Sequence, residues 1–293
     1  MPADLWSTSM LILVTAADAV LRLWPYVAGG ILLAVLLPRL ARDRAWQPPG
    51  WLPHPLALPL AALLGIASPL PTLGMMPLAL QLRGTPGRDR ASLAFLLASS
   101  LLNPHLFVLT LGVLGLTFAL AQAGAVLALG VTLGWLFGRR LRPAAELGAE
   151  DPPAPAPGYR PGLDVAGLAG HIVLYFLVGV TAGAALQVLL PRLGLLQWLG
   201  NHGWLSTPIL GWLGAPFYTC GGSAVPLAGG LAQAGFRPGT LFAFLLLGPA
   251  LRGSTLATLG CLLPRRALLA CLALLALAGG LLGLGLDHVL GMV

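Results

Sequence analysis

Two short motifs carry the residue types best suited to binding a solute, at residues 68–77 (SPLPTLGMMP) and 217–226 (FYTCGGSAVP). In each, a small residue (Gly74 or Ser223) stands three positions before a proline. This spacing predicts that the proline occupies the first turn of a helix, where its missing N–H costs nothing. The small residue then lies near the N-cap. Free N–H groups and the positive end of the helix dipole would face the ligand, which favours an anionic or electron-rich solute.

Cys220 is the one cysteine inside a motif, and it is the candidate metal ligand of the chain. A cysteine at a helix N-terminus has a lowered pKa and offers a thiolate. The alternative is that it is a small buried hydrophobe, as most buried cysteines are. Cys261 and Cys271 lie in plain apolar runs, where we expect them to serve packing.

Asn103 and Arg252 occupy matching positions in the segments that follow the two motifs. An arginine inside an apolar run is costly and predicts a functional role, although it can also cap a carbonyl end. Asn103 is followed by a proline that frees a backbone carbonyl, and a purely structural amide is equally compatible with the sequence. His105 could titrate or bind a soft cation, but a hydrogen-bonded structural histidine is the preferred interpretation. The candidate solute-binding residues are Pro71, Thr72, Gly74, Pro77, Asn103, Tyr218, Cys220, Gly221, Ser223, Pro226 and Arg252.

A duplicated segment contains these positions, because Pro226 follows Pro77 by 149 residues (226 − 77) and the flanking residues recur at the same spacing. Leu64-Gly65 matches Leu213-Gly214, Pro77-Leu78-Ala79 matches Pro226-Leu227-Ala228, Arg88 matches Arg237, and Ala94-Phe95-Leu96-Leu97 matches Ala243-Phe244-Leu245-Leu246. A duplicated unit with Gly/Pro-broken apolar segments at matching positions is typical of secondary transporters. It predicts a first repeat over 1–142, a Pro-rich linker over 143–162 and a second repeat over 163–293.

The composition requires a lipid environment. Of the 293 residues, 57% are hydrophobic and only 9% are charged, against about 25% charged in a soluble domain. The net charge is +7, but the arginines cluster at the ends of apolar segments, as membrane orientation signals do. Nucleic-acid binding is therefore not expected. The Arg-only, Ala/Leu/Pro-rich composition suggests a prokaryote.

The apolar runs predict an all-α integral membrane protein of two inverted repeats, each with long spans and a Gly/Pro-broken hairpin. The first half should hold a span at 17–37, with Asp18 at its end, then a broken segment at 56–82 whose two half-helices meet at 68–74. A segment at 91–120 interrupted at Asn103 and a span at 122–138 should follow. The second half should hold a span at 165–190, a broken segment at 206–234, a segment at 240–263 interrupted at Arg252, and a span at 267–290. If the broken segments are re-entrant hairpins, each half has three spans and the copies insert in opposite orientations. If they cross fully, the span count rises toward ten.

The two motifs resemble those of the ArsP/YraQ-like predicted permeases, a family that often carries PxCSCGxxPLA in the first half and PxYxCxxxxxPxAxxL in the second, each followed by FLxxxPxxN. The resemblance covers roughly 65–110 and 211–257. It implies a permease for efflux of trivalent organoarsenicals or of soft and borderline metal ions. The first-half cysteine pair of the family falls on Pro71 and Leu73, and the second-half asparagine falls on Arg252.

These observations predict a multi-pass permease of the cell membrane with a cytoplasmic linker. It would move a metalloid, an organometalloid or a metal ion by alternating access, and be linked to arsenic resistance. The alternative is a small-anion transporter that uses Arg252. An intramembrane enzyme or a scaffold subunit is a further alternative, but no paired carboxylates and no HExxH pattern lie in an apolar run, so no enzyme is expected. No cofactor is expected, the bilayer and a small solute are the expected partners, and the sequence leaves the oligomeric state open.

Overall fold

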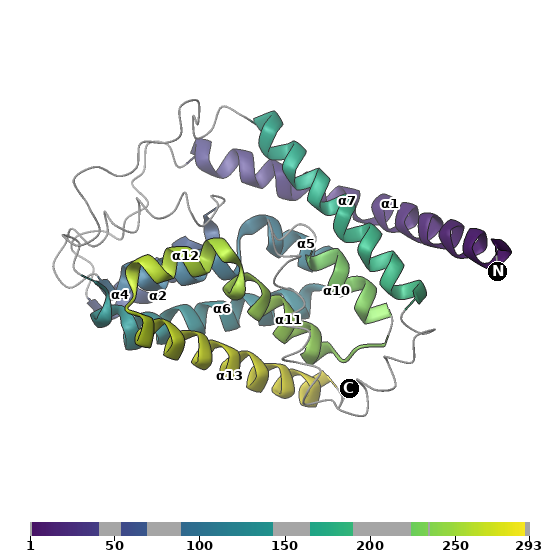
Figure 1. The fold of residues 1–293 in the computed structure, drawn as a ribbon. Coiled ribbons are helices and arrows are strands. Elements are labelled where there is room, and N and C mark those ends of the chain that lie inside the picture. The colour runs from purple at the N-terminus through teal and green to yellow at the C-terminus, as the bar shows by residue number, and fades with distance from the viewer. Residues whose placement is uncertain are drawn as a thin grey trace.

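A computed structural model describes residues 2–40, 54–68, 89–142, 165–189, 224–233 and 235–290, and all regular structure in these ranges is helical (Figure 1). The first half holds α1 (Pro2–Leu40), α2 (His54–Ala67), α4 (Asp89–Leu101), α5 (Pro104–Leu114) and α6 (Leu116–Phe137), with a 3-10 turn η1 at Gly138–Arg140. The second half holds α7 (Val165–Leu189), α10 (Ala224–Gln233), α11 (Pro238–Leu251), α12 (Gly253–Leu262) and α13 (Arg265–Leu290). The fold class expected from the sequence, a helical membrane protein, is confirmed.

Local sequence explains where several helices begin and end. Pro104 and Pro238 open α5 and α11, because a proline in the first turn loses no hydrogen bond. Gly115 has φ 90° and separates α5 from α6. Gly235, with φ 93°, makes the turn between α10 and α11. Both glycines adopt the left-handed region that side chains disfavour.

The duplication seen in the sequence recurs in the helix boundaries. The helices α4, α5 and α6 begin at Asp89, Pro104 and Leu116. The helices α11, α12 and α13 begin at Pro238, Gly253 and Arg265, each 149 residues after its counterpart (265 − 116 for the last pair). Three consecutive helices therefore start at equivalent positions in both halves.

The contacts between these helices are also duplicated. A Cβ on Gly134 of α6 would meet the Arg90 carbonyl oxygen and the Ala94 side chain of α4. A Cβ on the equivalent Gly283 of α13 would meet the carbonyl oxygen of Gly239 and the side chain of Ala243 in α11. Small residues at equivalent positions thus let α6 pack closely on α4 in the first half and α13 on α11 in the second. Such packing is usual in membrane proteins.

Equivalent helices run in opposite directions. The backbone N–H of Arg142, just after α6, donates to the carbonyl of Leu262 at the end of α12 (2.8 Å). The end of α6 therefore lies beside the beginning of α13, and the two helices leave this end of the molecule antiparallel to each other (Figure 1). The chain of α11 starts at the other end, where the N–H of Gly239 donates to Asp287 near the end of α13 (2.6 Å).

Six arginines gather where α6 ends and α13 begins, and we call this end of the molecule the arginine end. It carries Arg90, Arg139, Arg140, Arg142, Arg265 and Arg266. The end where α11 begins is the opposite end. Arg90 belongs to the first group because a Cβ on Gly138 would meet its backbone and side chain.

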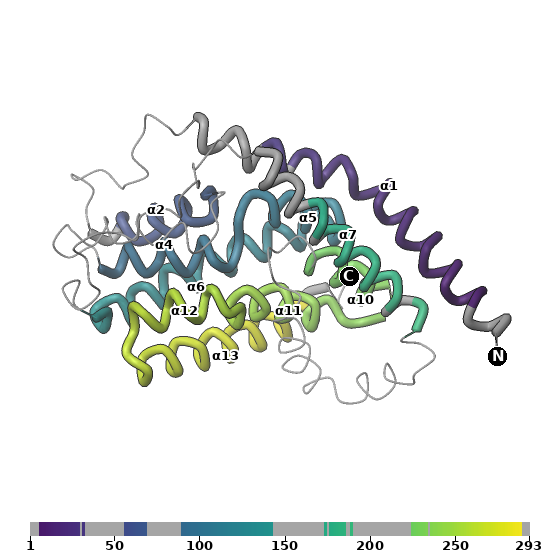
Figure 2. Tube along the Cα trace, turned by 45° about the horizontal axis from the view of Figure 1, so that its top comes forward, coloured from purple at the N-terminus to yellow at the C-terminus, as the bar shows by residue number. Residues whose placement is uncertain are grey.

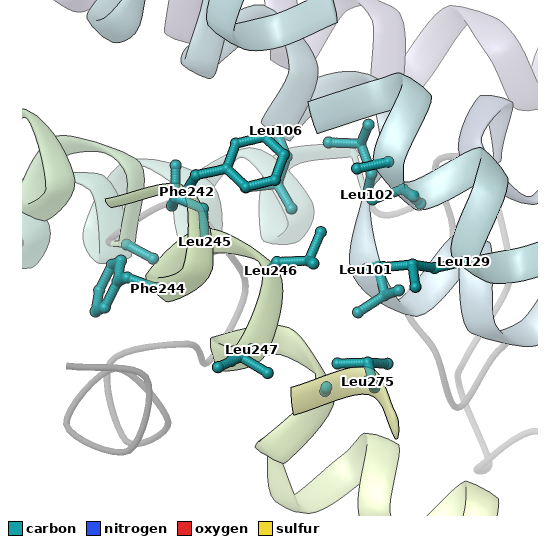
Figure 3. Close-up of a cluster of buried hydrophobic side chains, with 14 of the residues drawn as sticks. Leu101, Leu102, Leu106, Leu129, Phe242, Phe244, Leu245, Leu246, Leu247 and Leu275 are labelled. Atoms are coloured by element: carbon teal, nitrogen blue, oxygen red, sulfur yellow. The ribbon is translucent and has the colours of Figure 1, made fainter. Parts of the chain in front are cut away.

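The core lies where α4 and α11, the two most buried helices, meet between the halves. Figure 3 shows Leu246 of α11 pointing toward Leu101 and Leu102, which end α4. Phe242 of α11 stacks edge-on against Phe118 of α6, with ring centroids 5.6 Å apart. Apolar side chains thus fill the described contact between the two halves.

The predicted spans agree with the structure in most places. The span at 165–190 is α7, the span at 267–290 falls in α13, and the segment at 240–263 breaks at Arg252 as expected. Three described helices are long and apolar enough to cross a membrane by themselves, or up to five segments if each bent pair counts as one span. Boundaries of the two proposed repeats and the linker at 143–162 remain predictions, because residues 143–162 are outside the described ranges.

Two predicted segments can be compared in more detail. The first span was placed at 17–37, and the helix that contains it, α1, is longer and runs from Pro2 to Leu40. The broken segment at 56–82 was expected to form two half-helices that meet at 68–74, and α2 continues through Pro59 and ends at Ala67, while residues 69–82 lie outside the described ranges. Pro59 lies early in α2, where the loss of one hydrogen bond is tolerated more easily than in a helix centre.

The packing of α1 against α5 shows where α1 extends beyond the bundle. Gly112 of α5 lies against the ring of Tyr26, and Gly29 lies near Val108. Arg22, one turn before Tyr26, is therefore level with the turn at Gly115. The exposed ion pair between Asp18 and Arg22 (2.9 Å) lies at the edge of the bundle, and the helix before it projects past the other helices (Figure 2).

Candidate functional site

Each half contains one span that is broken near its centre. The pair α4 and α5 is bent by 42° at Leu102-Asn103, and the pair α11 and α12 is bent by 57° at Arg252. The breaks follow helices of 13 and 14 residues, about 20 Å of helix. Each break therefore lies deep in its span, which is where irregular backbone must be buried in protein or line a cavity.

Asn103 is the N-cap of α5. Its Oδ1 accepts a hydrogen bond from the backbone N–H of Leu106 (2.8 Å). Before the break, the hydroxyls of Ser99 and Ser100 donate to the carbonyl of Leu96, at 3.1 and 2.6 Å. Such back-bonding tends to bend helices. Of the two roles that the sequence left open for Asn103, the structural one is present.

Arg252 occupies the equivalent position in the other half. Its backbone is extended (φ −61°, ψ 137°), its side chain is half-buried, and it precedes α12 as Asn103 precedes α5. The N–H of Leu256 donates to the carbonyl of Arg252 (2.9 Å), as that of Phe107 does to the carbonyl of Asn103. An arginine thus replaces the capping amide of the first half at the same deep break.

Pro226 is the third residue of α10, which begins at Ala224. Within the described residues, which resume at Ala224, this proline falls in the first helical turn, as expected. The helix is short: its ten residues extend about 15 Å, half of a hydrocarbon core of about 30 Å. Since α10 ends just before α11 starts at the opposite end, its N-terminus lies near mid-depth.

Close packing fixes α10 against α5 of the first half and against α7 of its own half. Gly229 lies against Val113 of α5, and Gly230 meets the backbone of Gly183 in α7. Both α5 and α10 run toward the opposite end, so Ala224 is level with Val108. Asn103 is five residues before Val108, an axial distance of about 7 Å. The helix start of the second half and the break of the first half therefore lie at similar depth.

Most of the predicted binding residues fall outside the described ranges. These are Pro71, Thr72, Gly74, Pro77, Tyr218, Cys220, Gly221 and Ser223. Their roles remain predictions, including the proposed metal-binding role of Cys220. The structure describes three of the candidates, Asn103, Pro226 and Arg252. What these three share is their position, since each lies at a deep helix break or near a helix start.

One prediction about a polar residue was wrong. His105 was expected to be hydrogen-bonded, but it is 6% exposed and, within the described parts of the chain, neither ring nitrogen has a hydrogen-bond partner. The sequence analysis also missed Thr110, Gln122 and Thr255, which are buried with polar atoms that lack partners in the same described ranges. Their polar type inside apolar runs was the available signal.

Of the two described cysteines, one fits the expected packing role and one does not. Cys271 is buried in α13, whereas Cys261 is exposed on α12. The described residues contain no group of three or more His, Cys, Asp or Glu side chains that could hold a metal ion. A thiolate-rich site is thus not formed by this part of the chain.

Comparison with known proteins gives one match. Among curated proteins and among solved structures, no significant match is found. Residues 9–153 and 164–285 match the profile of the ArsP_1 family, described as predicted permeases. These two segments include every helix break described above and cover most of the sequence, and this chain therefore belongs to the ArsP_1 family of predicted permeases.

Proposed function

We propose that this permease moves a small solute by alternating access between two inverted repeats. The proposal rests on one observation: helices that start at equivalent positions in the two halves run in opposite directions. In transporters built this way, the solute site lies near mid-depth at the repeat interface and is formed by broken helices. The breaks at Asn103 and Arg252 and the start of α10 supply such elements.

The cargo that we propose first is a trivalent metalloid or organometalloid species, followed by a metal ion, with efflux as the direction. The support is the family membership and the motif that contains Cys220. Free N–H groups at a helix start stabilise electron-rich groups. A hydroxylated arsenical offers oxygen atoms to such groups and a soft centre to the thiolate.

We further propose that the arginine end faces the cytoplasm. The positive-inside rule relates arginines in short loops to the cytoplasmic side. The described residues 139–142 and 264–266 together carry five arginines, whereas the opposite end carries Arg237 in its described loop.

The direct test is transport by inside-out vesicles that contain the protein. Methylarsenous acid, arsenite, antimonite, Zn²⁺ and phosphate would each be offered and the accumulated element measured. We expect accumulation of at least one arsenic or antimony species over empty vesicles. Accumulation of none of the five solutes would contradict the proposal.

A second candidate, a small-anion transporter, is favoured by one observation: Arg252 replaces the amide of the other half at a deep break. The guanidinium would either pair with the anion or stand in for a coupling cation. Phosphate accumulation without arsenic accumulation would select this candidate.

Replacing Arg252 by Asn separates the roles. We expect the Arg252→Asn variant to change ion dependence or solute selectivity by about tenfold or more, because a fixed charge at membrane depth is worth several kcal/mol. Arg237→Asn is the matched control, since Arg237 is exposed at the opposite end. Unchanged coupling and selectivity in Arg252→Asn would show that this arginine serves the fold alone.

A further inference from the structure

His105 is the buried ionisable side chain that the site described above leaves unexplained. It is the second residue of α5, directly after the break at Asn103. Its side chain is 6% exposed, and neither Nδ1 nor Nε2 has a hydrogen-bond partner in the described parts of the chain. A buried polar group without partners costs about 1–3 kcal/mol. An ionisable residue at membrane depth is by default a functional candidate.

The neighbourhood of His105 offers no counter-charge in the described ranges. His105 shares the face of α5 that packs on α1 with Gly112, two turns farther on, which contacts Tyr26. Among the side chains that the structure describes on α1, α6 and α10, which pack against α5, the ionisable ones are Asp18, Arg22 and Tyr26, all on α1. Asp18 and Arg22 are exposed and pair with each other. A charged imidazolium in this conformation would be buried without compensation, which is very unfavourable.

The histidine is also specific to one half. Its equivalent 149 residues later is Ser254, a residue of α12 that is half-buried. The bend and the backbone hydrogen bond that follows it are duplicated without a histidine there. The fold of this segment therefore does not require an imidazole, and its retention needs another reason.

We propose that His105 is the proton-carrying residue of the transport cycle. The inference rests on the alternating-access function proposed above. In the conformation described here, the ring is buried, which favours its neutral form. When the region beside the break opens to water on one side, one ring nitrogen takes up a proton. When it opens to the other side, that proton is released, so that one proton crosses for each cycle and the imidazole returns to its neutral form.

The first test measures proton movement in proteoliposomes that hold a pH-sensitive dye, with methylarsenous acid as the imposed gradient. We expect His105→Gln to lose arsenical-driven proton flux by about tenfold or more, while arsenical exchange across the membrane persists. Glutamine keeps polar atoms but cannot carry a proton. His288→Gln is the control, because His288 is exposed near the end of α13. Proton flux in His105→Gln within twofold of the unmodified protein would overturn the proposal.

The second test uses the unmodified protein and needs neither a folded variant nor a transported solute. The protein, labelled with ¹⁵N-histidine in lipid nanodiscs, is titrated and the ring nitrogens are followed by NMR. The buried form keeps its ring neutral, and forms in which the break is open to water bring the ring into contact with protons. We therefore expect a separate, protonated His105 signal to grow as the pH falls from about 8 to about 5. Absence of any protonated His105 signal across that range would overturn the proposal. If methylarsenous acid is not moved at all, the cargo assignment fails, and this titration still decides the role of His105.

Discussion

The two halves differ in one pair of neighbouring residues, located where α4 begins in the first half and where α11 begins in the second. The large and small side chains of this pair have changed places. In the first half, Arg90 carries the side chain and Gly138 leaves room for it. In the second half, the equivalent of Arg90 is Gly239, and the equivalent of Gly138 is Asp287. The Oδ1 of Asp287 accepts from the N–H of Gly239 (2.6 Å). Because Arg237 makes no side-chain cap, this carboxylate caps α11 from 48 residues away.

Removing this carboxylate tests its role as a cap. We expect Asp287→Ala to lower the free energy of unfolding by about 1 kcal/mol, because an N-terminal N–H of α11 loses its acceptor. The measurement is thermal unfolding in detergent. Asp18→Ala is the control, since an exposed ion pair contributes about 0–1 kcal/mol. Equal stability of Asp287→Ala and the unmodified protein would contradict the cap.

At the scale of helices, small residues determine how α11 and α13 approach. An added Cβ on Gly283 would lie 2.5 Å from the carbonyl oxygen of Gly239, which is backbone and cannot rotate away. Gly280, one turn earlier on α13, has nothing within 4 Å. The same helix therefore holds one glycine that packing requires and one that it does not.

This pair provides a matched comparison. We expect Gly283→Ala to destabilise the protein by about 1–3 kcal/mol through forced separation of the two helices. Gly280→Ala should be neutral or stabilise by up to about 1 kcal/mol, since alanine favours helix. Unfolding followed by tryptophan fluorescence or by heating measures both. A Gly283→Ala protein as stable as Gly280→Ala would show that the contact is looser than described.

Over the whole molecule, the antiparallel arrangement of α6 and α13 places the charge of both halves at one end. The link from Arg142 N–H to the Leu262 carbonyl holds the two halves together there. Three equivalent pairs of helices start 149 residues apart, yet their directions are reversed. The orientation that we propose depends on this one charged end.

Labelling with a membrane-impermeant maleimide tests that orientation. In a variant without Cys220, Cys261 and Cys271, single cysteines would be introduced by Arg139→Cys, Arg266→Cys and Arg237→Cys. We expect the first two to react from the cytoplasmic side and the third from the outside, since the arginine end follows the positive-inside rule. Reaction of Arg139→Cys and Arg266→Cys from different sides would contradict the shared end.

The sequence predicted much of this architecture because proline, glycine and exact spacing act locally. The breaks at Asn103 and Arg252 and the start of α10 before Pro226 were all expected from neighbouring residues. The length of α1 was not, since apolar content does not say where a helix leaves the bundle. The state of His105 was also missed, because hydrogen-bond partners come from other helices. Cys220 and most of the motif residues stay predictions.

The exchange between Arg90 and Gly138 on one side and Gly239 and Asp287 on the other has an energetic consequence. In the alternating-access cycle proposed above, a carrier with two identical halves would have inward-open and outward-open forms of equal free energy. At one end of this molecule the Asp287 carboxylate caps α11, and at the other Arg90 lies over the ring of Trp135, 5.2 Å from its centre. The two contacts respond differently to salt, so we expect the unloaded protein to prefer one facing.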